Sequence, residues 1–364
     1  GVVRDISLTQ HNGLIRLQEG DDAIDWLIFE KDHEPSARAT RAAGEIFARQ
    51  RAGREAENFT VPIRWAVPTT ARALTMGRFW AFFTTTYETT LVGILNAPWK
   101  TNDDRTQLLE GEFNKELLSV ASELVLENIP RLLELWDEDP CRYFEALPGR
   151  FGGAETRNWA DEQLSREVYT LGQVRPTLPD QSGQLRVPAT VQIHPKDLPQ
   201  EAITVWAGYE GKPDSWIHPG VEHRIRRPRA LRFLPAGQTE ADITTWLEAL
   251  VEDGTVAASA AALRVAAILI EELPGGRHQD IQIAEIVLDA EGRLTSVQPG
   301  EIFVPGSHVA APGTRYVHPD LAEGENRNVL ARLGIEEISP LDEVRAMVDR
   351  GLDSDTPWET FWSL

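Results

Sequence analysis

The stretch Phe79–Leu109, FWAFFTTTYETTLVGILNAPWKTNDDRTQLL, decides how the first half of the chain folds. An aromatic run that ends at Phe83 leads into a threonine-rich segment, and a second apolar run, Leu91–Leu95, follows it. The polar loop 100–105 comes next, and a long segment with helical periodicity begins at Glu112. These patterns predict a strand, a threonine-rich turn, a second strand, a loop and a helix, in that order.

The polar loop holds the first candidate binding residues, because two cations and an amide lie between the strand and the helix. They are Lys100, Asn102 and Arg105. An arginine suits a phosphate ligand, since its guanidinium stays charged and offers a planar fork of donors. The neighbouring Asp103 and Asp104 leave a second interpretation open, in which Arg105 is an ordinary surface residue or forms an ion pair with them.

The run Phe79–Leu109 and the phrase FNKELL at 113–118 resemble the segment behind the nucleotide-binding module of sacsin-like proteins. Those proteins are relatives of the ninety-kilodalton heat-shock chaperones, in the ATPase superfamily shared with gyrase and histidine kinases. The resemblance covers about residues 55–135 and implies that Arg105 reaches the γ-phosphate of ATP from outside the nucleotide pocket. Lys100 and Asn102 are implied as weaker contacts to the nucleotide.

Two departures from the family pattern limit what the resemblance implies. The family's Phe-Pro-Thr-like turn is Phe83-Thr84-Thr85 here and lacks the proline, and the sequence has no N-x-x-x-D helix or D-x-G-x-G loop. The resemblance therefore implies that ATP and Mg²⁺ are bound mainly by a preceding domain, so this chain should not hold a complete active site. The chain opens with Gly-Val-Val rather than methionine, and we expect it to be a fragment of a longer ATPase.

The implied function is to transmit ATP binding and hydrolysis in the preceding nucleotide-binding domain as a conformational change. The intact protein would be a chaperone-like or defence ATPase, with a second copy or protein clients as further partners. A different interpretation stays open, in which the chain is a non-catalytic scaffold that binds other proteins.

Composition narrows the classes of partner. The chain has 364 residues, 41% of them hydrophobic, and 11 Trp, which is typical of a folded protein with more than one domain. The chain contains 36 Lys and Arg but 57 Asp and Glu, which gives a net charge of -21. This negative charge argues against general binding to nucleic acid or anionic membranes. The longest apolar run, near Ala257–Ile270, contains Arg264 and is too short to span a bilayer, so we expect a cytoplasmic protein.

The order of the predicted elements indicates the fold class. Strands that alternate with helices up to Trp136 predict an α/β fold of the α+β kind. The segment 137–153 is rich in acidic residues, proline and glycine, and is the expected domain boundary. We therefore expect a middle-domain-like β-α sandwich in 1–150, a second mixed α/β domain in 151–305 and a helical C-terminal segment in 306–364.

Single residues make sharper predictions about the elements. Pro62 predicts that its strand lies at a sheet edge or contains a bulge, because proline donates no ladder hydrogen bond. Pro130 predicts that the helix expected over Glu112–Trp136 is kinked or split in two. Thr239 is the expected N-cap of a helix over Glu240–Glu252, since its hydroxyl can accept a backbone N–H of the first turn.

Five arginines in the nine residues 224–232 form a basic segment in an acidic chain. In the functional interpretation, Arg224, Arg226, Arg227 and Arg229 contact nucleic acid or an acidic partner. In the second interpretation, the arginines neutralise nearby acidic surface of the protein itself. The second is favoured, because the segment lacks the interleaved aromatic and glycine residues of RNA-binding motifs.

Cys141 and the histidines carry no catalytic or metal-binding signature. Cys141 is the single cysteine and lies among acidic residues, which predicts an unreactive thiol with a raised pKa. The His-Pro pairs at 194, 218 and 318 lack the spacing of metal ligands, so we expect no metal site.

Overall fold

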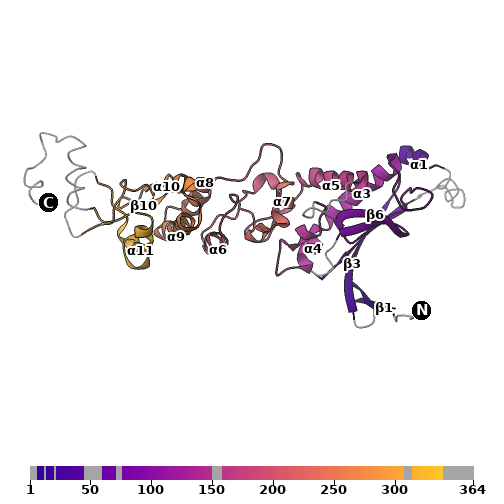
Figure 1. Cartoon of the computed structure of the whole chain (residues 1–364), viewed down its shortest axis with the longest axis horizontal. Helices are drawn as coiled ribbons and strands as arrows, with labels where there is room; N and C mark the ends of the chain where they lie inside the picture. Colours follow the sequence, from indigo (N-terminus) through magenta and orange to yellow (C-terminus); the bar gives the residue numbers. More distant parts are fainter. Residues whose placement is uncertain are drawn as a thin grey trace, which may run out of the picture. The chain divides into compact units, whose positions relative to one another are not determined.

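The computed structural model describes residues 6–11, 14–19, 22–44, 60–70, 76–149, 158–306 and 314–338 (Figure 1). The chain divides into two compact units. The first consists of Gly1–Val191 and Gly220–Gln238, and the second of Gln192–Pro219 and Thr239–Leu364. The expected boundary at 137–153 falls within the first unit, and much of the segment 306–364 lies outside the described residues.

The first unit is built around one mixed sheet of seven strands, in the order β1-β2-β3-β4-β7-β5-β6. The strands are β1 (Ile6–His11), β2 (Leu14–Glu19), β3 (Asp22–His33), β4 (Val61–Pro68), β5 (Met76–Ala81), β6 (Phe83–Val92) and β7 (Ile94–Asn96). The other elements are α1 (Ala37–Ala43), α3 (Glu112–Glu127), α4 (Ile129–Leu135), η2 (Arg142–Glu145), α5 (Trp159–Gly172), β8 (Leu178–Pro179), β9 (Leu185–Arg186), η3 (Pro188–Thr190) and α7 (Arg226–Leu231). This mixture of sheet and helices confirms the expected α+β class.

β4 lies in the middle of the sheet, because it pairs antiparallel with β3 on one side and with β7 on the other. Its alternate residues Val61, Ile63 and Trp65 are buried, as a period of two predicts. The expected edge position of Pro62 is therefore wrong for the strand as a whole. The proline is tolerated because β7 reaches only Arg64–Ala66, so residue 62 has a paired strand on one side only.

The threonine-rich segment forms part of strand β6 rather than the expected turn. Threonine is β-branched and fits an extended, half-buried backbone. The chain reverses instead at Phe82, whose φ is 63°, directly before β6. It reverses again at Gly93, so the second expected strand is divided and β7 runs parallel to β5. A Cβ at Gly93 would lie 2.0 Å from the carbonyl oxygen of Ala66, so only glycine fits there.

α3 packs against β3 and β4 and lies beside α5 (Figure 1). Its apolar residues recur at helical spacing, and Leu117, Leu118 and Ala121 are fully buried. Pro130 breaks the helix, as expected. α4 begins directly after Asn128 with the proline in its first turn, where the missing N–H leaves no hydrogen bond unmade.

Glu116 of α3 joins the end of β3 to the start of α1. Its carboxylate accepts hydrogen bonds from His33 Nε2 (2.7 Å), the N–H of Ser36 (2.7 Å) and the hydroxyl of Ser36 (2.5 Å). Burial raises the pKa of Glu116, but the hydrogen bonds from Ser36 and His33 outweigh it, so the pKa is lowered overall.

We expect Glu116→Ala to lower the free energy of unfolding of the first unit by about 1–3 kcal/mol, because charge-assisted hydrogen bonds are lost. The folded pKa lies below the unfolded one, so this stabilisation is present above the unfolded pKa and is lost as the pH falls through the folded pKa. Urea unfolding at neutral and at acid pH measures it. The exposed Glu134→Ala is the control; an equal loss at both pH values would contradict the prediction.

The second unit is mainly helical and packs around α9 (Val256–Glu272), whose alanines lie in its core. Further elements of this unit are α6 (Gln200–Gly208), α8 (Ile243–Glu248), η5 (Ala249–Val251), η6 (Gly275–Arg277), α10 (His278–Gln282), β10 (Glu285–Leu288), β11 (Leu294–Ser296) and α11 (Gly324–Arg332).

The expectation that Thr239 is the N-cap of this segment's helix, α8, is wrong. Asp242 is the N-cap of α8 and accepts the N–H of Thr245 (2.7 Å), since the N–H of Ala241 still donates to the carbonyl of Ile193 (3.0 Å).

A buried histidine, His194, is enclosed by three tryptophans of the second unit. Its ring centroid lies within 5.9 Å of those of Trp206, Trp216 and Trp246. The indole N–H of Trp246 donates to Nδ1 (2.8 Å), and Nε2 donates to the carbonyl of Ile217 (2.9 Å). Because an indole only donates, this pattern requires the neutral ring, and both nitrogens are engaged within the core.

A short structural motif occurs twice, and we name it the bridge motif. Each copy starts with a hairpin in which an aspartate, Asp180 or Asp289, accepts the backbone N–H groups two and four residues ahead. The glycine three residues after the aspartate has a positive φ, 82° at Gly183 and 77° at Gly292, as this tight turn requires. The hairpins are β8–β9 in the first unit and β10–β11 in the second.

Each copy of the bridge motif ends on an aromatic-apolar-His-Pro sequence. Gln192 forms a parallel bridge with Trp216, and Phe303 forms the equivalent bridge with Tyr316. The N–H of Gln192 donates to the carbonyl before Trp216 (2.8 Å), and that of Phe303 to the carbonyl before Tyr316 (3.1 Å). A 3₁₀ turn then begins at the proline, as η4 (Pro219–Val221) and η7 (Pro319–Leu321).

Candidate functional site

The loop that contains Arg105 is held in shape by Asn102. The side-chain oxygen of Asn102 accepts the N–H groups of Thr106 (2.9 Å) and Gln107 (3.0 Å), and its amide donates to the Thr106 hydroxyl (3.0 Å). Thr101 and Leu108 bridge the base of the loop as an antiparallel pair. The amide of Asn102 therefore organises the loop, as asparagine commonly does in turns.

Asn114, in the first turn of α3, joins the helix to both ends of the same loop. Its Oδ1 accepts the N–H of Lys100 (2.8 Å), and its Nδ2 donates to the carbonyls of Lys100 (2.7 Å) and Leu109 (2.8 Å). Lys100 in turn donates from its ammonium to the carbonyl of Ala42, near the end of α1 (2.9 Å). Sequence reasoning missed Asn114, because an asparagine inside a helical pattern gives no sign of its partner.

Arg105 lies exposed at the tip of this loop with a φ of 55°. Its backbone N–H donates to the carbonyl of Asn102 (3.0 Å). Among the residues that the structure describes, no side chain forms an ion pair or a hydrogen bond with its guanidinium, and this includes the exposed Asp103 and Asp104. The ion pair with these two acids is thus not formed, and the exposed position of Arg105 also fits the interpretation as an ordinary surface residue.

The three residues predicted to meet a nucleotide therefore have different roles in the structure. Arg105 presents its charge to solvent, whereas the polar ends of Asn102 and Lys100 are engaged within the protein. The arrangement offers one cation on a preorganised backbone, and a single guanidinium can bind one phosphate group through two donors.

The β5–β6 hairpin is joined to the Arg105 loop by a hydrogen bond from the hydroxyl of Thr86 to the carbonyl of Thr106 (3.1 Å). Phe82 and Phe83 are 63% and 69% exposed, which is unusual for large apolar side chains in a well-packed unit. The N–H of Phe82 donates to Oδ1 of Asn96 at the end of β7 (3.0 Å). The sequence contains these two residues in an aromatic run that also supplies the buried Phe79, so the pattern alone could not separate core from surface.

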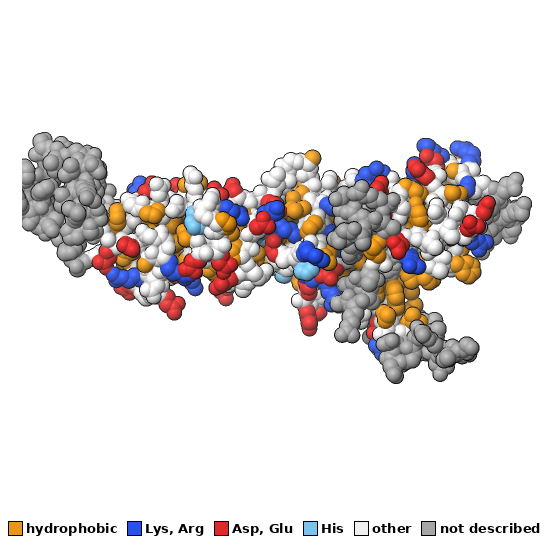
Figure 2. All heavy atoms as spheres, in the orientation of Figure 1, with side chains coloured by type: hydrophobic (Ala, Val, Ile, Leu, Met, Phe, Trp, Pro, Cys, Tyr) orange, Lys and Arg blue, Asp and Glu red, His pale blue; other side chains and the backbone are white. Residues whose placement is uncertain are grey.

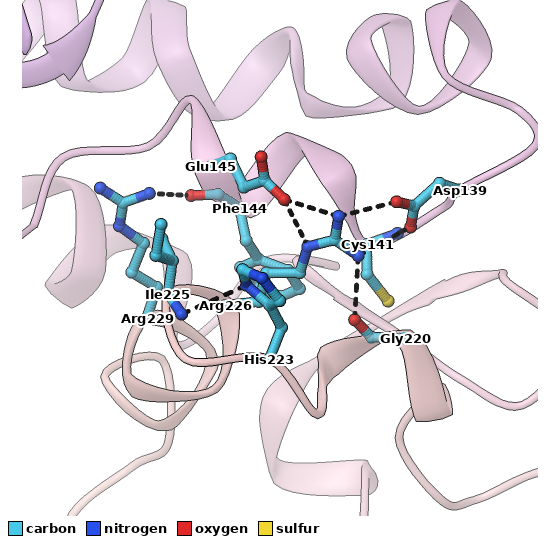
Figure 3. A network of polar contacts seen from close by, with 9 residues as sticks. All are labelled: Asp139, Cys141, Phe144, Glu145, Gly220, His223, Ile225, Arg226 and Arg229. Carbon is cyan, nitrogen blue, oxygen red and sulfur yellow. Dashed lines mark hydrogen bonds and ion pairs between the residues drawn. The ribbon is translucent and has the colours of Figure 1, made fainter. Parts of the chain in front are cut away.

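Arg226, one of the four candidate nucleic-acid contacts, is the centre of an internal polar network (Figure 3). Its guanidinium forms a bidentate ion pair with Asp139 (2.9 and 2.7 Å) and a further ion pair with Glu145 (2.5 Å). It also donates to the carbonyl of Gly220 (3.1 Å). The side chain is only 14% exposed, so its charge is compensated inside the first unit.

The other three candidate arginines differ in their surroundings. Arg227 pairs with Glu222, and Arg229 is buried and donates to the carbonyl of Phe144 (2.7 Å), while Arg224 is exposed. On the face shown in Figure 2, Lys and Arg side chains are interspersed with Asp and Glu. These positions favour the interpretation in which the arginines neutralise the protein's own acids.

Cys141 lies buried in the same region. Burial raises the pKa of its thiol and the neighbouring Asp139 raises it further, while Arg226 acts in the opposite direction. The expected raised pKa is confirmed, and it makes the thiol a poor nucleophile. Within the described part of the chain, His, Cys, Asp and Glu side chains form no group of three that could hold a metal ion.

The chain has no recognised relative among known proteins, since no family model, curated protein or solved structure matches it. The described helices include none with the length and apolar character needed to cross a bilayer.

Proposed function

We propose that this chain is the transmitting part of a cytoplasmic, sacsin-like ATPase. In this proposal, Arg105 contacts the γ-phosphate of ATP that a preceding domain holds together with Mg²⁺. The contact is made when ATP is bound and is released after hydrolysis, and the first unit moves with it. The moving unit then acts on a protein client or on a second copy.

The observation that carries the proposal is the state of Arg105. Its guanidinium is exposed and unneutralised by described neighbours, and its loop is fixed by Asn102 from within and by Asn114 from α3. A charge held on a rigid backbone reaches a transferring phosphate at little entropic cost. Because Asn114 belongs to α3, a displacement of the loop is passed directly to the main helix of the unit.

The test is ATP turnover by the full-length gene product with Arg105→Ala. We expect turnover to fall at least about tenfold, because an arginine supplied from outside the pocket stabilises the transferring phosphate. ATP affinity should change little, since other residues hold the nucleotide. Arg105→Lys should restore little, because lysine lacks the planar fork.

The matched control is Arg131→Ala, since Arg131 is also exposed and pairs only locally, with Glu134. It should leave turnover unchanged. Tight ATP binding with equal turnover in the wild type and in Arg105→Ala would remove the proposed role. Absence of ATP binding by the full-length protein would favour the scaffold function instead.

A further inference from the structure

We propose that His194 makes the second unit acid-labile, so that protonation of this one ring opens the core in which it lies. The proposal concerns the second unit alone and does not depend on the role proposed for Arg105. We call His194 and the three indoles around it, those of Trp206, Trp216 and Trp246, the tryptophan cage. All four side chains are buried, and His194 is 0% exposed.

The hydrogen bonds of the tryptophan cage admit only the neutral form of the ring. The indole N–H of Trp246 lies 2.8 Å from Nδ1 of His194 and can only donate, so Nδ1 must accept. A protonated ring carries a hydrogen on both nitrogens and would set its own N–H against that of Trp246. Nε2 keeps its acceptor, the carbonyl of Ile217, in either state. Protonation therefore removes one hydrogen bond and leaves two donors facing each other inside the core.

The indoles around the ring compensate for a positive charge only in part. Trp216 is stacked on the imidazole with 5.6 Å between the ring centroids, and such a face attracts a cation. A face supplies no acceptor for a hydrogen on Nδ1, however, and Trp206 and Trp246 cross the ring at 82° and 86°. A buried ion whose N–H meets another donor is costly, so the protonated ring is favoured when the cage opens to water.

The charged and titratable side chains on the elements that form the cage are exposed or half-buried. They are Lys196, Asp197, Glu201, Asp214, His218, Asp242 and Glu248. Lys196 and Asp197 pair with each other (3.8 Å), and the carboxylates of Asp242 and Glu248 accept backbone N–H groups. Because these carboxylates are hydrated or bound to the backbone, they offset a charge on the buried ring only weakly.

The position of the cage allows its loss to spread through the second unit. The parallel bridge between Gln192 and Trp216 lies directly beside it in the chain. Trp206, on α6, donates its indole N–H to the carbonyl of Trp246 on α8 (3.0 Å), and both helices pack against α9. Opening of the cage therefore releases α6 and α8 from the central helix of the unit.

The direction of the pH dependence follows from the neutral ring. In the unfolded chain a histidine takes up a proton near its ordinary pKa of about 6.5, whereas the caged ring has no place for that proton. Opening of the second unit thus takes up one proton that the closed unit does not bind. The stability of the unit is present above about pH 6.5 and is lost as the pH falls below it.

Hydrogen exchange of this chain, corrected for the intrinsic exchange rate at each pH, tests the proposal. In the wild type, protection of amides in α6, α8 and α9 should fall about tenfold per pH unit between about pH 6.5 and pH 5. In His194→Gln the fall should be less than about twofold per pH unit, because glutamine does not titrate. His218→Gln and His278→Gln are the controls, since both histidines are half-buried residues of the same unit and both variants should keep the wild-type fall.

Two results of the exchange experiment would overturn the proposal: an unchanged fall in His194→Gln, or its disappearance in either control. A second measurement needs only the wild type. The chain has eight histidines, and in nitrogen NMR spectra of labelled histidine we expect one ring to stay neutral, with its hydrogen on Nε2, down to about pH 5 while the unit is closed. If every ring gained a proton while α9 stayed protected, His194 could not make the unit acid-labile.

Discussion

Replacement of Leu117 by alanine is expected to lower the free energy of unfolding of the first unit by about 2–5 kcal/mol. Leu117 is fully buried in α3, which packs against β3, β4 and α5. The lost methyl groups leave a cavity that the surrounding helices and strands cannot fill without moving. The second unit, which has its own core around α9, should stay folded.

Native-state hydrogen exchange in increasing urea separates the two units. In Leu117→Ala, amides of α3 and β4 should exchange at lower urea than in the wild type, while amides of α9 should exchange as before. Val174→Ala is the control, because truncation at an exposed site changes stability by no more than about 0.5 kcal/mol. Equal loss of protection in α3 and α9 would show that the two units unfold as one.

Replacement of Arg226 by alanine is expected to cost about 2–4 kcal/mol, because it leaves two carboxylates without their shared cation. Asp139 and Glu145 would face each other across the vacated site, and the carbonyl of Gly220 would lose a donor. Part of the penalty is relieved by solvent, since the side chain of Asp139 is 38% exposed. Urea unfolding followed by tryptophan fluorescence measures the loss.

Two further variants distinguish the network from general charge effects. Arg226→Lys keeps the charge but loses the bidentate geometry, so it should recover only part of the stability. Arg224→Ala removes an exposed arginine two residues away and should be close to neutral. If Arg224→Ala were as damaging as Arg226→Ala, the internal network could not be the source of the effect.

Local patterns were sufficient to predict much of the first unit. The buried stripe of α3, the alternation of β4 and the helix break at Pro130 all follow from spacing within a few residues. The threonine-rich segment was misjudged, because the reversal at Phe82 lacks the glycine or proline that signals a turn. A strained turn carries no local signature in the sequence.

The candidate site was predictable only in part, for a different reason. Arg105 could be singled out by its charge and its place in a loop. The partners that decide the role of Arg226 could not, since Asp139 and Glu145 lie 87 and 81 residues away along the chain. Such pairings are set by packing between distant segments.

The bridge motif has a consequence for how this chain can change in length. Its two bridges close segments of very different size, from 192 to 216 in one copy and from 303 to 316 in the other. The longer segment accommodates α6, yet both copies close with the same backbone pairing. By loop-closure entropy the difference in length costs only about 0.5 kcal/mol. The backbone pairing that closes each copy is therefore compatible with intervening segments of quite different length, and the His-Pro turn follows it in the same form in both.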